Sequence, residues 1–174
     1  VNERGAIVVD KQLHTTADNI WAMGDVTGGL QFTYISLDDY RIVRDELLGE
    51  GKRSTDDRKN VPYSVFMTPP LSRVGMTEEQ ARESGADIQV VTLPVAAIPR
   101  ARVMNDTRGV LKAIVDNKTQ RMLGASLLCV DSHEMINIVK MVMDAGLPYS
   151  ILRDQIFTHP SMSESLNDLF SLVK

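Results

Sequence analysis

Hydrophobic and polar positions follow a broken pattern over the first fifty residues. Two short runs, 6–10 and 20–23, are rich in β-branched or aromatic residues and predict strands. The second run leads into the turn-forming segment 24–29. Apolar residues at helical spacing then predict a helix that Asp38 or Asp39 opens and Gly49 ends.

A polar, charged stretch, 51–60, separates this region from the rest and predicts a linker between domains. Two short strands and one helix bury too little surface to form a core of their own. We therefore assign residues 1–52 to the end of a larger domain, 53–60 to the linker, and 61–174 to a second domain.

The second region has the pattern of a complete α+β domain. Strands are predicted at 61–66, 88–95, 110–115 and 122–130, with a hairpin-like turn at 116–120. Thr77, with Glu79 and Gln80 behind it, predicts a capped helix that Gly85 ends. Ser132 and Ser163 are predicted to cap two further helices. This order favours an antiparallel sheet flanked by helices.

Composition excludes several classes of protein. The 174 residues carry a net charge of −4, which argues against nucleic acid as the main partner. The only cysteine, Cys129, permits no internal disulfide and fits a cytoplasmic setting. No apolar run approaches the roughly 20 residues of a membrane span, so no membrane partner is expected. The polar start, without methionine, predicts a processed chain or a piece of a longer one.

The strongest chemical signal is His159-Pro160, followed by Glu164. Histidine exchanges protons near neutral pH because its unperturbed pKa is about 6.5. A nearby glutamate can fix the tautomer of the ring and stabilise its charged form. The pair predicts an oriented acid/base, and the alternative is a structural histidine held by Glu164.

Three segments together resemble the flavin-dependent pyridine nucleotide-disulfide oxidoreductases, which include glutathione reductase, dihydrolipoamide dehydrogenase and mercuric reductase. Segment 16–25 resembles the family's second flavin-binding motif, and 65–78 resembles the start of its dimer-interface domain. The third is the His159-Pro160 pair with Glu164. The segments stand in the family's order and cover nearly the whole chain.

The resemblance implies that residues 1–52 are a remnant of an α/β FAD-binding domain. Asp25 would then accept a hydrogen bond from a ribityl hydroxyl of FAD, and Gly24 would let the backbone approach closely. Phe32 and Thr33 would open a helix whose N–H groups face the flavin. Tyr34 stands where the family often has proline.

The resemblance also implies a homodimeric NAD(P)H oxidoreductase in which His159 and Glu164 act on the partner subunit's redox cysteine pair. Electrons would pass through FAD and those cysteines to a disulfide or similar thiol-reactive substrate. The peptide bond before Pro160 is often cis in this family. The cysteine pair, the first glycine-rich motif and the nicotinamide domain are not among these residues. We therefore expect this chain alone to be inactive and to retain no cofactor.

Two alternatives come from other classes of protein. The chain as it stands could be an inert dimerisation module. It could also be a small metal-binding domain, although a plain structural role is favoured for the residues that would serve as ligands: Cys129, Asp131, His133 and Glu134.

Overall fold

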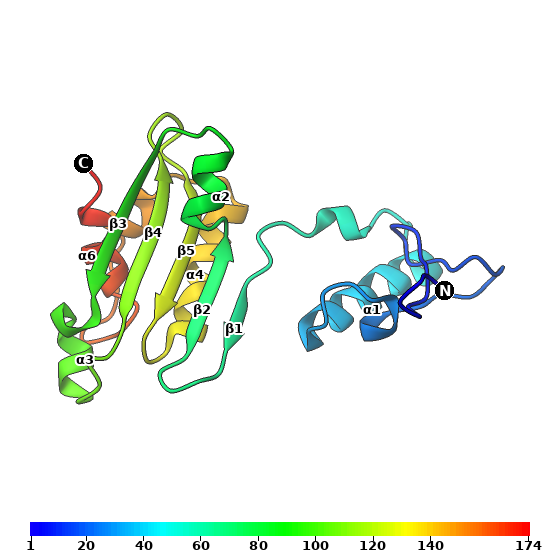
Figure 1. Ribbon diagram of the computed structural model, residues 1–174, viewed down its shortest axis with the longest axis horizontal. Coiled ribbons are helices and arrows are strands. Elements are labelled where there is room, and N and C mark those ends of the chain that lie inside the picture. The colour runs from blue at the N-terminus through cyan, green and yellow to red at the C-terminus, as the bar shows by residue number, and fades with distance from the viewer. The chain divides into compact units, whose positions relative to one another are not determined.

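A computed structural model describes all residues, 1–174. Its internal contacts divide the chain into two compact units, Val1–Lys59 and Asn60–Lys174, which are described separately (Figure 1). No helix in either unit is both long enough and apolar enough to cross a bilayer.

The first unit is built around one long helix, α1 (Thr33–Leu48), with two short 3-10 turns, η1 (Gly24–Thr27) and η2 (Thr55–Asp57). The strands predicted at 6–10 and 20–23 are wrong. A strand requires a continuous ladder of backbone hydrogen bonds to a neighbour. These runs form only isolated contacts, such as the single bridge between His14 and Trp21 and the bond from Ile7 N to Val26 O (2.9 Å).

Helix α1 begins earlier than the apolar pattern predicts, at the Phe32–Thr33 start that the family resemblance implied. Phe32, not Asp38 or Asp39, is its N-cap residue, and it supplies no capping side chain. The two aspartates lie inside the helix, where their carboxylates pair with arginines from the segment 53–58. Aspartate is favoured at helix starts, which is why the apolar pattern pointed to these two residues. In the structure their carboxylates form ion pairs with distant arginines and cap no helix.

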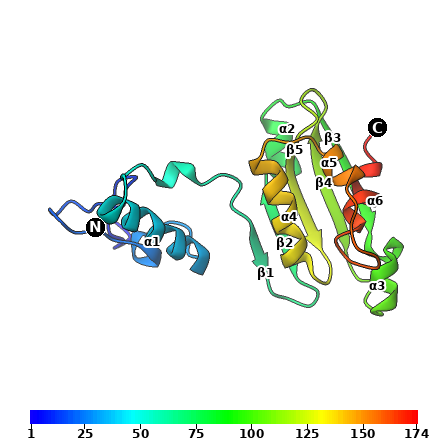
Figure 2. The same ribbon diagram turned by 180° about the vertical axis from the view of Figure 1, so that it is seen from behind.

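The second unit is an α+β domain with a five-stranded antiparallel sheet in the order β1-β2-β5-β4-β3. Its strands are β1 (Tyr63–Val65), β2 (Leu71–Gly75), β3 (Ile88–Pro94), β4 (Val110–Asp116) and β5 (Met122–Leu128). Helices α4 (Ser132–Asp144), α5 (Ser150–Asp154) and α6 (Ser165–Ser171) cover one face (Figure 2). Helix α2 (Glu78–Glu83) lies on the other face. The predicted fold class is confirmed.

The core lies between the sheet and the helices α4 and α6. Alternate residues of the central strands point into it, including Leu111, Ala113 and Val115 from β4. Met135 and Val139 meet them from α4 because their spacing places them on one helix face. Burying a large aliphatic or aromatic side chain contributes about 1.5–3 kcal/mol, so this layer holds the domain together.

Of the three helix caps predicted in the second unit, the structure confirms one. The capping box of α2 is confirmed: Thr77 Oγ1 accepts from Gln80 N (3.0 Å), and Gln80 Oε1 accepts from Thr77 N (2.9 Å). Ser132 is not a cap, because its buried hydroxyl bonds Pro70 O (2.8 Å) instead. Ser163 is not a cap either, since α6 follows Glu164.

Two elements were not predicted. Strand β2 follows the Pro69-Pro70 pair and returns antiparallel to β1, with Tyr63 opposite Arg73. Helix α3 (Pro99–Val103) is short and has proline in its first turn, where proline is favoured. A 3-10 turn, η3 (Val95–Ala97), precedes it.

Candidate functional site

The structure brings the predicted acid/base pair together in the loop between α5 and α6. His159 Nδ1 lies 2.8 Å from Glu164 Oε2. The histidine side chain is 70% exposed, whereas the glutamate side chain is only 17% exposed. The His159–Pro160 peptide bond is cis, as the resemblance implied. The ring is therefore held on one side and open to solvent on the other.

Ser161 holds the glutamate in place, and sequence reasoning did not find this role. Its backbone N–H donates to Glu164 Oε1 (3.0 Å). Its hydroxyl donates to Thr158 O (2.7 Å) and accepts from Glu164 N (3.2 Å). A serine three residues before a glutamate is the only signal in the sequence, and many turns share it.

These contacts keep Glu164 ionised. Burial alone would raise the pKa of this carboxyl, but hydrogen bonds from His159 and Ser161 outweigh burial and lower it below its ordinary value. An ionised Glu164 accepts the Nδ1–H of the ring, which leaves Nε2 as the nitrogen that can take up a proton. The arrangement can therefore transfer protons at a single, outward-facing atom.

The segment that leads to His159 is anchored by Asn167 of α6. Its Nδ2 donates to three carbonyl oxygens at the end of α5: Leu152 (2.8 Å), Arg153 (3.0 Å) and Gln155 (3.0 Å). These carbonyls would otherwise lack partners at a helix end. The neighbouring Ile156 is 93% exposed, so the chain leaves this anchor as a projecting loop.

The residues predicted to bind a flavin lie in the first unit. Gly24 has a φ of 75°, a left-handed conformation that suits glycine. Asp25 is exposed, and its carboxylate forms no hydrogen bond or ion pair within the chain. Phe32 and Thr33 are the N-cap and first residue of α1, which contacts η1. The structure thus places a free carboxylate and a helix start without a side-chain cap in one small unit.

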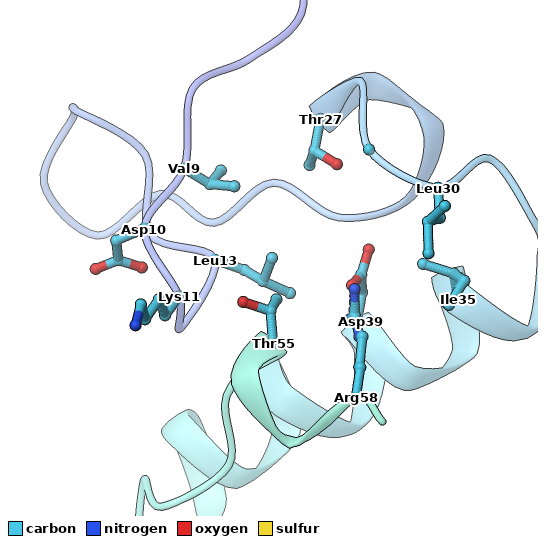
Figure 3. A pocket seen from close by; sticks show the side chains of 11 residues that line it. Val9, Asp10, Lys11, Leu13, Thr27, Leu30, Ile35, Asp39, Thr55 and Arg58 are labelled. Carbon is cyan, nitrogen blue, oxygen red and sulfur yellow. Dashed lines mark hydrogen bonds and ion pairs between the residues drawn. The ribbon is translucent and has the colours of Figure 1, made fainter. Parts of the chain in front are cut away.

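A buried ion-pair network lies beneath this turn. Asp39 Oδ2 accepts from Gly24 N (2.7 Å), and the other oxygen of Asp39 pairs with the Arg58 guanidinium. Arg58 Nε also donates to Asp38 Oδ2 (2.8 Å). Asp39 and Arg58 both line a hollow of about 320 Å³, and Figure 3 labels them among the side chains around it. Arg58 lies in the segment predicted to be a polar linker, so the sequence did not indicate that it pairs with Asp38 and Asp39.

The four residues considered as metal ligands do not form a metal site. No group of three or more His, Cys, Asp or Glu side chains is arranged to hold a metal ion. Cys129 is buried, with Sγ 3.9 Å from Met135 Sδ, and burial raises the pKa of its thiol to about 12. The His133 ring instead packs edge-on against Phe66, at a centroid distance of 5.5 Å.

Comparison with known proteins identifies the family. The model for the pyridine nucleotide-disulphide oxidoreductase dimerisation domain matches residues 61–170, and the pyridine nucleotide-disulphide oxidoreductase model matches residues 1–39. The chain belongs to the pyridine nucleotide-disulphide oxidoreductases. The family predicted from the three sequence segments is confirmed, and its members are FAD- and NAD(P)H-dependent and dimerise through this domain.

Two relatives, and a solved structure of one of them, show how much of the family's length the chain represents. The probable pyridine nucleotide-disulfide oxidoreductase RclA of Escherichia coli is 99% identical over the whole chain, which covers 40% of RclA. A solved Cu(II) complex of RclA, described as an HOCl-induced flavoprotein disulfide reductase, matches with a TM-score of 0.99. This match covers 100% of the present chain and 40% of the chain in that structure. Mercuric reductase of Staphylococcus aureus is 35% identical, over 94% of this chain and 30% of the reductase.

A more distant structure supports the fold. LpdA of Mycobacterium tuberculosis matches with a TM-score of 0.86 at 23% identity, over 97% of this chain and 37% of LpdA. The chain therefore spans 40% or less of the length of these relatives. The roles of His159, Glu164, Gly24, Asp25, Phe32 and Thr33 stay predictions.

Proposed function

We propose that this chain is the C-terminal part of a homodimeric flavoenzyme that passes electrons from NAD(P)H to a disulfide or similar thiol-reactive substrate. Residues 1–52 would complete an FAD-binding domain, 53–60 would link the domains, and 61–174 would form the dimer interface. A redox cysteine pair, not among these residues, would receive electrons from the flavin.

The observation that carries this proposal is the exposed His159 ring with Nδ1 fixed 2.8 Å from Glu164. Disulfide exchange needs a base to form the attacking thiolate and an acid to protonate the departing one. Histidine serves both needs near neutral pH. Within the chain the only thiol, that of Cys129, is buried, which supports a role for His159 toward cysteines elsewhere, and we assign these to the partner subunit.

Two features of the first unit, the Asp25 carboxylate and the start of α1, support binding of a flavin nucleotide. The Asp25 carboxylate is exposed and unpaired, so it can accept a hydrogen bond from a ribityl hydroxyl. The start of α1 has no side-chain cap, and a helix N-terminus stabilises negative charge. A bound flavin would supply two-electron chemistry between the nicotinamide and the cysteine pair.

Substitution in full-length RclA, at the positions that match this chain, tests the acid/base role. His159→Ala should leave NAD(P)H-dependent flavin reduction unchanged and lower the turnover of a disulfide probe about 100-fold or more. Stopped-flow flavin absorbance and steady-state reduction of 5,5′-dithiobis(2-nitrobenzoate) separate the two steps. His133→Gln, a half-exposed histidine outside the loop, is the matched control. Normal disulfide turnover in His159→Ala would refute the assignment.

Cu(II) is a second candidate electron acceptor because a solved structure of RclA is a Cu(II) complex. Parallel assays with Cu(II), following Cu(I) with a chelating dye, would distinguish the two acceptors. If His159 serves only thiol protonation, its replacement should slow disulfide reduction and spare Cu(II) reduction.

The chain alone should behave as a dimerisation module without activity. Analytical ultracentrifugation should show a dimer, and the solution should be colourless in the visible range because the chain retains no flavin. Visible flavin absorbance after purification would contradict the proposed division of the cofactor site.

A further inference from the structure

Asp39 is a buried acid with an unusual position. It lies in the second turn of α1, and the residue is 2% exposed. Its Oδ2 accepts the backbone N–H of Gly24 at 2.7 Å. An unpaired charge at such depth is costly, so its retention requires compensating partners.

Arg58 provides that compensation from a distant part of the chain. Its Nη2 pairs with Asp39 and its Nε donates to Asp38 Oδ2 at 2.8 Å. The Arg58 side chain is 17% exposed and the Asp39 side chain 3%. Although burial disfavours the charged guanidinium, bonds to the two aspartates raise the pKa of Arg58 overall. The planar guanidinium can bond both carboxylates at once, which a lysine ammonium cannot reproduce.

The third member of this network is the turn that carries Asp25. Gly24 has left-handed backbone geometry and belongs to a 3-10 turn, outside any sheet ladder. Its N–H therefore depends on the Asp39 carboxylate for a partner. Because Asp25 is the next residue, the direction of the Gly24 amide helps to set where the Asp25 carboxylate points.

We propose that Asp39 and Arg58 are positioning residues that hold the Gly24–Asp25 turn in the geometry that binds the flavin. This inference rests on the proposed flavin site at Asp25 and extends it to two residues outside the Gly24–Asp25 turn. It also assigns a role to residue 58, in the segment that the sequence predicted as a linker. A change in that segment should reach the flavin turn through Arg58 and Asp39.

Hydrogen exchange in flavin-free, full-length RclA, at the matching positions, tests the anchor without any cofactor. Asp39→Ala should accelerate exchange of the Gly24 amide about 5- to 150-fold, because loss of a buried acceptor costs about 1–3 kcal/mol and about 1.4 kcal/mol corresponds to a factor of ten. Arg58→Lys, which keeps the charge and is the milder change, should accelerate it less. Asp56→Asn, which removes only a surface pair with Lys11, should leave it unchanged. Equal Gly24 exchange in the parent protein and in a folded Asp39 or Arg58 variant would overturn the proposal.

Flavin affinity of full-length RclA, at the matching positions, tests the consequence. Arg58→Lys should weaken FAD binding to the apoprotein several-fold, and Asp39→Asn should weaken it more, when both are measured well below the unfolding temperature. A purely structural role would lower the unfolding temperature and leave the FAD dissociation constant of the folded protein unchanged, which would overturn the proposal.

Asp25→Ala separates this proposal from the proposed function. If Asp25→Ala leaves FAD affinity intact, the flavin site is wrongly placed, and the positioning role falls with it even if the Gly24 exchange results hold. If Asp25→Ala weakens FAD binding while Asp39→Asn and Arg58→Lys do not, the flavin site stands and only the positioning role fails.

Discussion

Replacing Ser161 with alanine should loosen the acid/base pair without unfolding the domain. The hydroxyl makes two hydrogen bonds, to Thr158 O (2.7 Å) and from Glu164 N (3.2 Å). Each contributes about 0.5–1.5 kcal/mol net, so their joint loss should cost about 1–3 kcal/mol locally. Water can replace part of this in an exposed loop, which favours the lower half of that range. The bond from Ser161 N to Glu164 Oε1 is a backbone bond and survives the change.

The direct readout is the ¹⁵N chemical shifts of the His159 ring. In the parent chain, Nδ1 should carry the proton in the neutral ring because Glu164 accepts it. Ser161→Ala should mix the two neutral tautomers, since a mobile Glu164 holds Nδ1–H less firmly. Ser161→Thr keeps a hydroxyl and should restore the parent spectrum. Ser171→Ala, which removes an exposed hydroxyl bond to Asn167 O, is the matched control.

Unchanged ring shifts in Ser161→Ala, with the carboxyl signal of Glu164 also unchanged, would refute this reasoning. The hydroxyl would then be an ordinary turn contact, and the backbone N–H of Ser161 alone would hold Glu164. Loss of the tautomer preference in both Ser161→Ala and Ser171→Ala would point to general loosening of the loop instead.

Four further predictions follow from burial, capping and charge. Thr77→Ala should cost about 1 kcal/mol in chemical denaturation by removing the capping box, and Thr92→Ala, outside any cap, should cost less. Phe170→Ala should cost about 3–5 kcal/mol because the ring is fully buried. Cys129 should resist thiol reagents at pH 8 until the chain is unfolded, since its pKa is raised to about 12. Because the pKa of Glu164 is lowered in the folded chain, the stability that its carboxylate contributes is complete above pH 4.5 and is lost as the pH falls through the pKa of the folded state. NMR titration should show the His159–Glu164 contact opening in that acidic range, and Glu164→Gln should abolish this step.

The sequence predicted those features that depend on neighbouring residues. The capping box of Thr77 and Gln80 spans three positions, and the His159–Glu164 pair spans five, so local spacing was sufficient. The strands β3, β4 and β5 were also found, because their apolar content and the hairpin at 116–120 are continuous in the sequence.

Features that depend on distant partners were missed or misassigned. Asp39 and Arg58 are 19 residues apart, and nothing in the local pattern links them. The run 6–10 has strand composition but finds no ladder partner within the chain, so composition alone misled. Strand β2 was missed because a proline pair usually ends a strand, whereas here the chain turns through it and returns.

Because Cys129 is buried, the chain can be labelled at an introduced cysteine without first removing its native one. The single native thiol is shielded in the core, so a cysteine introduced at the surface would be the only one to react with a fluorophore or spin label. Ile156 is 93% exposed and three residues from His159, which makes it a suitable position. A label there would report the mobility of the loop, and whether a second copy of the chain approaches it, without altering any native sulfur.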